Sequence, residues 1–249
     1  MDDLRPPPPP VPELRSSDVA PEPTEVPWRA REAFLIVLLS LVTGGFFTML
    51  AVTAIEDETI AVLMATLLIE ASLGFWVWMW VRLRHRVGAA ALGLTFRRGD
   101  VGAGFLAAVI GLAAGAAVTQ LVLTIANNVT DRPVETPQQL PDIQHGTELF
   151  LAGIAVVIVA PIAEELFFRG FIYQAFRRWR RPWPGPTQAV FFSGIVFAIA
   201  HVSPVIMPSI FVLGIILAYL FEKRASVVAT IAAHVAYNLI GFIIIVVSA

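Results

Sequence analysis

The sequence predicts an all-α polytopic membrane protein with about seven transmembrane helices in one bundle. The first observation behind this prediction is composition: 57% of the 249 residues are hydrophobic, 14% are charged, and the mean hydropathy is +0.76. Soluble domains carry about 25% charged residues. The second observation is that the apolar residues are grouped in stretches of roughly 20, the length that a membrane-spanning helix needs. The net charge of −2 does not suggest a nucleic-acid partner, and the lack of cysteine excludes disulfides and thiolate sites.

The first 30 residues differ from the rest of the chain. Half of the 18 prolines lie before residue 28, and almost nothing there is apolar enough to be buried. Such a composition is typical of a disordered, partly polyproline segment. The acidic start is unlike a signal peptide. We therefore predict a Pro-rich cytoplasmic tail over 1–30 and one membrane-embedded domain over 31–249.

Seven apolar stretches follow the tail, and each is long enough to be a membrane helix. The third contains Gly111 and Gly115 at the spacing of a close-packing helix face. The hairpin of the fifth and sixth is short, because its first leg of about 17 residues reaches only about 25 Å. Its tip, with Pro204 and Pro208, is expected to stop short of the outer surface. The stretches are 32–54, 59–81, 101–126, 149–176, 187–203, 205–221 and 226–248.

The charges between these stretches alternate in sign along the chain. All Lys and Arg residues except Arg132 and Arg169 fall on one side of the predicted membrane, and the loop with Glu56, Asp57 and Glu58 falls on the other. The positive-inside rule then predicts a cytoplasmic N-terminus and a C-terminus outside. The Arg-rich composition, almost free of Lys, favours a GC-rich bacterium and hence its plasma membrane.

Few ionisable side chains remain inside the stretches, and such residues are costly in lipid and commonly functional. At 1.5 Å per residue, four polar side chains on three helices lie about 15–21 Å from the ends of their helices, near mid-membrane. We therefore predict one buried polar site. Glu70 has no evident partner and is interpreted as structural. The four side chains are those of Glu164, His201, His234 and Asn238.

The spacing of these residues suggests roles. Glu165 and Arg169 are four apart, so they are predicted to pair on one helix face. Glu164 then lacks a local partner, which suits a general base. Asn238 shares a face with His234 and is expected either to orient that ring or to donate to a developing oxyanion.

Two further expectations concern the surroundings of the site. Phe197 shares a face with His201 and is expected to form a wall against its ring. Pro161, one turn before the glutamates, is expected to open its helix.

One glutamate and two histidines are compatible with two chemistries. They can activate a water for attack on a peptide carbonyl without any cofactor. They can also bind Zn²⁺ through Glu164, His201 and His234 with an open position. Two non-peptidase alternatives are a membrane scaffold that acts by binding a partner, and a proton-coupled transporter. The lack of an internal repeat counts against the transporter.

Three motifs resemble those of a known family. "EELFFR" fits EExxxR, "FAIAH" fits FxxxH and "HVAYN" fits HxxxN, in that order on successive stretches. Over about residues 149–241 the chain resembles the CAAX-protease and bacteriocin-processing family (CPBP, also called Abi) of intramembrane endopeptidases.

The resemblance implies a helical bundle with a cavity open to the cytoplasm and a peptide or membrane-protein substrate, with or without a lipid anchor. It implies Glu164 as the base, His201, His234 and Asn238 as the rest of the site, and Glu165 with Arg169 as support. Family members have been described both as metalloproteases and as metal-free glutamate proteases, and some serve in bacteriocin immunity. The metal question therefore stays open at this point.

Overall fold

The structure, a computed structural model, describes residues 26–130, 133–134, 146–177, 186–201 and 203–248. The predicted tail up to residue 25 and the basic residues Arg178, Arg180 and Arg181 lie outside them. The described residues contain helices and no strand. The prediction of an all-α polytopic membrane fold is confirmed.

Each predicted stretch corresponds to a helix. The helices are α1 (Ala33–Ala54), α2 (Glu58–Arg84), α3 (Asp100–Val129), a continuous fourth helix (Gly146–Arg177), α7 (Pro186–Ala200), α8 (Met207–Arg224) and α9 (Val227–Ser248). Within the described residues, five of these are long and apolar enough to cross a membrane, namely α1 with its short 3₁₀ lead-in Ala30–Glu32, α2, α3, the fourth helix and α9. The other two, α7 and α8, are shorter, with 15 and 18 residues.

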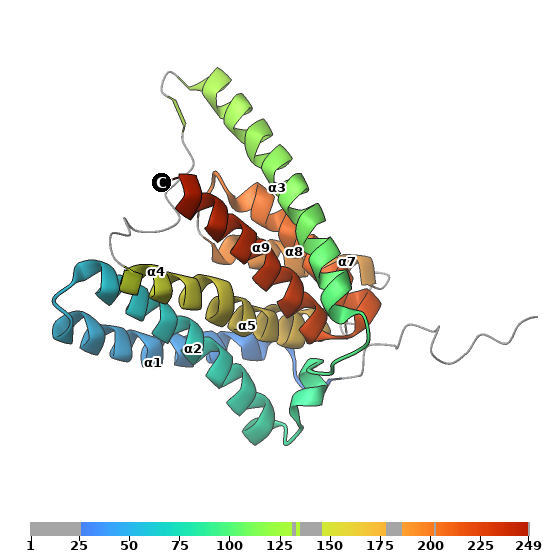
Figure 1. Cartoon of the computed structure of the whole chain (residues 1–249). Coiled ribbons are helices and arrows are strands. Elements are labelled where there is room, and N and C mark those ends of the chain that lie inside the picture. The colour runs from blue at the N-terminus through green and yellow to red at the C-terminus, as the bar shows by residue number, and fades with distance from the viewer. Residues whose placement is uncertain (1–25, 131–132, 135–145, 178–185, 202, 249) are drawn as a thin grey trace, which may run out of the picture.

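The helices form two groups (Figure 1). In the first, α1 packs along α2, and α2 packs against the fourth helix. In the second, α3 packs against α8 and α9, and α7 packs against α8. Small residues allow close contact in the second group, because a Cβ built on Gly104 of α3 would lie 2.7 Å from the carbonyl oxygen of Ala229 in α9. Gly111 and Gly115 of α3 face Tyr237 of α9, as expected for a close-packing face.

The fourth helix lies at the centre of the bundle and is not uniformly α-helical. It consists of α4 (Gly146–Ala152), the wider π-helical segment η3 (Gly153–Val159), α5 (Ala160–Glu165), a second π-helical segment η4 (Leu166–Tyr173) and α6 (Gln174–Arg177). Every side chain from Phe167 to Tyr173 is buried. This segment is therefore buried on all sides and belongs to the core of the bundle.

The segment before α1 is packed against this core. Trp28 is fully buried, stacks on the ring of Phe171 at 5.1 Å and donates its indole N–H to the Phe171 carbonyl at 3.0 Å. Val26 is buried as well. Ordered packing thus begins before residue 31, where the predicted membrane domain starts.

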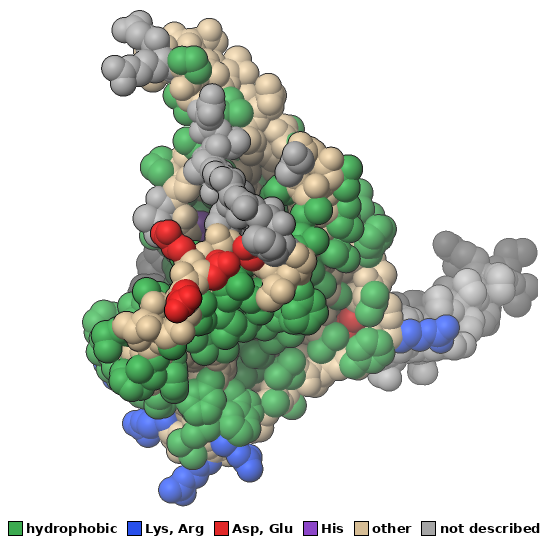
Figure 2. All heavy atoms as spheres, turned by 60° about the vertical axis from the view of Figure 1, so that its left-hand side comes forward, with side chains coloured by type: hydrophobic (Ala, Val, Ile, Leu, Met, Phe, Trp, Pro, Cys, Tyr) green, Lys and Arg blue, Asp and Glu red, His purple; other side chains and the backbone are tan. Residues whose placement is uncertain are grey.

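The outer surface of the bundle is apolar, with many exposed Leu, Ile, Val and Phe side chains on α1, α3 and α9. In Figure 2 this surface forms a broad hydrophobic area. The loop between α1 and α2 carries exposed Glu56 and Asp57, and α2 begins with exposed Glu58. We call this side the acidic end. The opposite, basic end carries the Arg and Lys residues that close α2 and α8 and precede α3 (Arg82, Arg84, Arg86, Arg97, Arg98, Lys223 and Arg224).

Candidate active site

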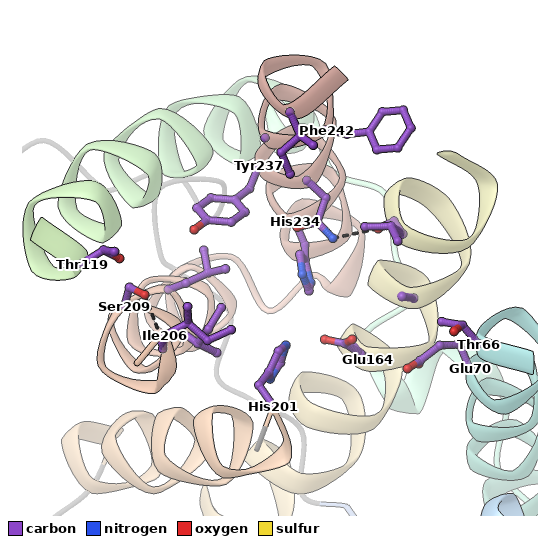
Figure 3. A pocket seen from close by; sticks show the side chains of 17 residues that line it. Thr66, Glu70, Thr119, Glu164, His201, Ile206, Ser209, His234, Tyr237 and Phe242 are labelled. Atoms are coloured by element: carbon purple, nitrogen blue, oxygen red, sulfur yellow. Dashed lines mark hydrogen bonds between the residues drawn. The ribbon is translucent and has the colours of Figure 1, made fainter. Parts of the chain in front are cut away.

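A cavity of about 530 Å³ lies where the two groups of helices meet. Its polar lining comes from α2, α3, α5, the α7–α8 hairpin and α9, so no single helix forms it. Figure 3 shows the carboxylates and imidazoles turned toward one space. The polar residues that line the cavity are Thr66, Glu70, Thr119, Glu164, His201, Ser209, His234, Tyr237 and Asn238.

Glu164 stands on α5 and faces this cavity. Its Oε2 atom is buried and has no hydrogen-bond partner among the described residues. A buried carboxylate oxygen is normally satisfied by protein or water. An oxygen left open toward a cavity can therefore hold a water molecule or a substrate group.

Glu165, the next residue, points the other way and does not line the cavity. Its Oε1 atom accepts a hydrogen bond from Arg169 Nη1 at 2.7 Å, and both side chains have no solvent exposure. The second guanidinium nitrogen of Arg169 donates to the Gly214 carbonyl of α8 at 3.0 Å. The pair is thus buried beneath the cavity, where each charge is neutralised by the other.

Phe197 of α7 completes this layer. Its fully buried ring lies 4.3 Å from the Arg169 guanidinium carbon, a distance suited to a cation–π contact. The same ring contacts the imidazoles of His201 at 4.8 Å and of His234 at 5.7 Å between centroids. Phe197 is therefore a wall for both histidines, although it does not itself line the cavity.

The two histidines are held through their Nδ1 atoms. His201 Nδ1 lies 2.8 Å from the Phe197 carbonyl oxygen, and His234 Nδ1 lies 3.0 Å from Glu165 Oε1. A carbonyl can only accept, and the Glu165 carboxylate already accepts from Arg169, so Nδ1 carries the proton in both rings. In the neutral rings each Nε2 is then an acceptor.

Asn238 contacts the fourth helix and not the ring of His234. Its amide nitrogen donates to the Val156 carbonyl of η3 at 2.8 Å, and the ring of His234 is oriented by Glu165. Pro161 explains why that carbonyl is free. In η3 each backbone hydrogen bond joins residues five apart, as from the Ala160 N–H to the Ala155 carbonyl. In this register the Val156 carbonyl would accept from the N–H of residue 161. Proline has no N–H, so Asn238 supplies one.

Glu70 is the cavity residue that the sequence reasoning interpreted as structural. It lies close enough to Glu164 to interact electrostatically, and its Oε2 atom is buried without a hydrogen-bond partner in the described residues. An ionisable residue in a membrane helix was the feature of the sequence that could have indicated a functional role for Glu70. The sequence did not show that α2 packs on α5. Helix α2 packs closely on α5 at Gly74, one turn after Glu70, because a Cβ built on Gly74 would lie only 3.4 Å from the Cβ of Ala163.

The cavity is closed toward the basic end and extends toward the acidic end. Its floor is the layer of Glu165, Arg169 and Phe197, each with no exposure. Along α9 the lining runs from His234 to Ile245, close to the end of the helix at Ser248.

In the described part of the chain, no group of three or more His, Asp or Glu side chains is gathered closely enough to hold a metal ion. A zinc site needs ligand atoms at about 2.0–2.2 Å from the ion. The predicted alternative set of Glu164, His201 and His234 therefore shares a cavity without forming a ligand cluster.

Comparison with known proteins agrees with the motifs. Residues 146–240 match the family model described as "Type II CAAX prenyl endopeptidase Rce1-like". No curated protein and no solved structure gives a significant match. The matched segment contains the three motifs and, with them, all of the predicted site residues. This segment of the membrane protein, residues 146–240, is therefore similar to the Rce1-like CAAX endopeptidases.

Proposed function

We propose that the protein is an intramembrane endopeptidase in which Glu164 activates a water molecule for attack on a peptide bond. One observation carries the proposal: Glu164 has an unpartnered carboxylate oxygen in a cavity that the side chains of His201 and His234 also line. The similarity of residues 146–240 to a peptidase family supports a peptide substrate and an embedded site. The roles of the individual residues are inferred from their contacts.

In the first step, Glu164 accepts a proton from water as the oxygen attacks the carbonyl carbon. The carbonyl π electrons move to its oxygen, giving a tetrahedral oxyanion. As the C–N bond breaks, Glu164 returns the proton to the leaving amine. No other reactant is needed, so the step balances as hydrolysis.

The oxyanion needs a hydrogen-bond donor, and Asn238 is the best candidate. One of its two amide hydrogens is used on Val156, which fixes the side chain, and the other is free to donate. The neutral histidines accept at Nε2, so they suit orienting the water. Donation to the oxyanion would require a protonated ring, and His234 beside Glu165 is the better placed for that charge.

The decisive experiment is cleavage of a membrane-anchored reporter library by the purified protein and by Glu164→Gln, with and without a strong chelator. We expect Glu164→Gln to lower cleavage on the order of 10²–10⁴-fold. It should leave yield and unfolding unchanged. Glu58→Gln, an exposed glutamate outside the cavity, is the matched control and should cleave normally.

The chelator arm separates the two chemistries. Cleavage that survives chelation supports the glutamate mechanism, whereas loss that zinc restores would make Glu164 and the histidines metal ligands. Activity retained in Glu164→Gln would refute the assignment of the base. No cleavage of any reporter by the wild type would favour a non-catalytic scaffold or immunity role.

A further inference from the structure

We propose that substrate enters this cavity from the acidic end of the bundle, on the non-cytoplasmic side of the membrane. The sequence had suggested a cavity open to the cytoplasm, but that expectation came from the family resemblance. The proposed substrate is accordingly a peptide segment exposed outside the cell or in the outer half of the bilayer. This choice of substrate rests on the proposed peptidase function, whereas the direction of entry does not.

The route from the basic end is blocked by packed side chains. Below Glu164 and the histidines lie Glu165, Arg169 and Phe197, which have no exposure. On α9 and α8 the same level is filled by Ala233 and Leu217, also fully buried. A close-packed layer of this kind leaves no passage for a peptide.

The lining of the cavity rises from this layer in one direction on three helices. On α9 it runs from His234 through Asn238 to Ile245, and Ile245 is 40% exposed. Helix α2 starts at the acidic end, and its lining residues Glu70 and Thr66 lie in its first half, with Thr66 nearer that end. Thr119 lies in the second half of α3, which ends on the same side.

The short hairpin explains why space remains there. Both α7 and α9 start at the basic end, but α7 has 15 residues and α9 has 22. At 1.5 Å per residue, the tip of the hairpin falls short of the end of α9 by about 10 Å. His201 and Ile206, at this tip, line the cavity. Because α7 is shorter than α9, the space next to the upper part of α9 is not filled by α7, and this space is the proposed opening above the site.

The side of the membrane follows from charge. The basic residues of the described chain gather at the end where the cavity is closed, and Glu56, Asp57 and Glu58 lie at the end toward which it extends. In Figure 2 acidic and basic side chains likewise gather on different parts of the surface. Basic loops remain in the cytoplasm, so the acidic end faces outward.

The chain has no cysteine, so single cysteines can report access directly. The test uses Thr66→Cys and Ile245→Cys at the cavity and Arg84→Cys at the basic end, treated with a charged, membrane-impermeant maleimide. Val62→Cys is the matched control for Thr66→Cys, since Val62 is an exposed α2 side chain outside the cavity lining. Intact cells and inverted vesicles are labelled in parallel.

In intact cells, Thr66→Cys and Ile245→Cys should react faster than Val62→Cys by on the order of tenfold, because only a hydrated thiol ionises. Arg84→Cys should react only in inverted vesicles. The proposal is overturned if the cavity cysteines react only in inverted vesicles. It is also overturned if they never react faster than Val62→Cys, or if Arg84→Cys reacts in intact cells.

A second arm concerns the substrate. Reporters carry the same scissile segment either outside or in the cytoplasm, and Glu164-dependent cleavage of the outside form alone is expected. Glu164-dependent cleavage of the cytoplasmic form alone would overturn entry from outside and leave the peptidase proposal standing. Failure of all cleavage would overturn the peptidase proposal, while the labelling result would still decide the direction of entry.

Discussion

Arg169 has three partners in the interior of the bundle: the carboxylate of Glu165, the carbonyl of Gly214 and the ring of Phe197. Through them it joins the fourth helix to α7 and α8. Glu165 in turn accepts from His234 of α9. This pair therefore holds together the helices that carry the site, while Glu164, its neighbour, keeps an unpartnered oxygen in the cavity.

Removing either charge of the pair should destabilise the protein, although neither residue lines the cavity. Glu165→Ala or Arg169→Ala leaves the other group buried and uncompensated, which costs about 3–5 kcal/mol. We expect a sharp fall in membrane yield and in the thermal midpoint measured in detergent. The exposed Arg84→Ala serves as control and should behave as wild type. Normal yield for Arg169→Ala would contradict a structural role for the pair.

Glu70 is expected to matter for turnover because its carboxyl group faces the cavity beside Glu164. Glu70→Gln keeps size and polarity but can neither accept nor release a proton. The expected result is a fall in kcat on the order of tenfold or more at unchanged yield, measured with a cleaved reporter. Glu58→Gln, on the same helix, should leave kcat unchanged. An unaltered kcat in Glu70→Gln would return this residue to a structural role.

At the scale of the element, the fourth helix contains a proline that lowers its stability but shapes the site. Pro161 removes a backbone N–H in the middle of a membrane helix, and the backbone widens into η3 around it. Asn238 then meets the Val156 carbonyl. π-Helical turns of this kind are frequent at functional sites.

Pro161→Ala should therefore stabilise the helix and impair the site. The new N–H can bond to the Val156 carbonyl, so part of the roughly 3 kcal/mol cost of an interior proline is recovered. Asn238 then shares its acceptor with the backbone and is held less firmly. We expect a higher thermal midpoint together with slower cleavage. Pro208→Ala, in the first turn of α8 where no N–H is needed, is the control. An unchanged midpoint with full activity would show that Val156 does not depend on Pro161.

Helix contact in the second group depends on single glycines. A Cβ at Gly104 would lie 2.7 Å from the Ala229 carbonyl oxygen, closer than real contacts allow, whereas a Cβ at Gly102 meets nothing within 4 Å. Gly104→Ala should lower unfolding stability by about 1–3 kcal/mol, the usual cost of overpacking. Gly102→Ala should be neutral or slightly stabilising. Equal midpoints for the two variants would contradict this close α3–α9 contact.

At the scale of the whole molecule, the site lies between two groups of helices, and the segment before α1 packs against the first group. Trp28 stacks on Phe171 of the central helix and bonds to its carbonyl. Trp28→Ala should cost about 3–5 kcal/mol, as for other buried tryptophans. The matched control is Trp78→Ala, because Trp78 is 45% exposed. Similar unfolding midpoints would show that the segment does not contribute to the bundle.

The sequence by itself determined the class of the protein and the neighbours along each helix. Composition and the length of the apolar stretches predicted the helices to within a few residues, because a membrane imposes a fixed span and internal hydrogen bonding. The pairing of Glu165 with Arg169 followed from their spacing, since residues four apart on a helix are neighbours. The three motifs indicated the family whose model residues 146–240 match.

Only the tertiary structure decided what depends on contacts between helices. These include the hydrogen bond of His234 to Glu165, that of Asn238 to Val156, and the position of Glu70 beside Glu164. It also decided the direction of the cavity. Helical periodicity says which side chains share a face, but not which helix that face meets or where a shorter helix leaves space.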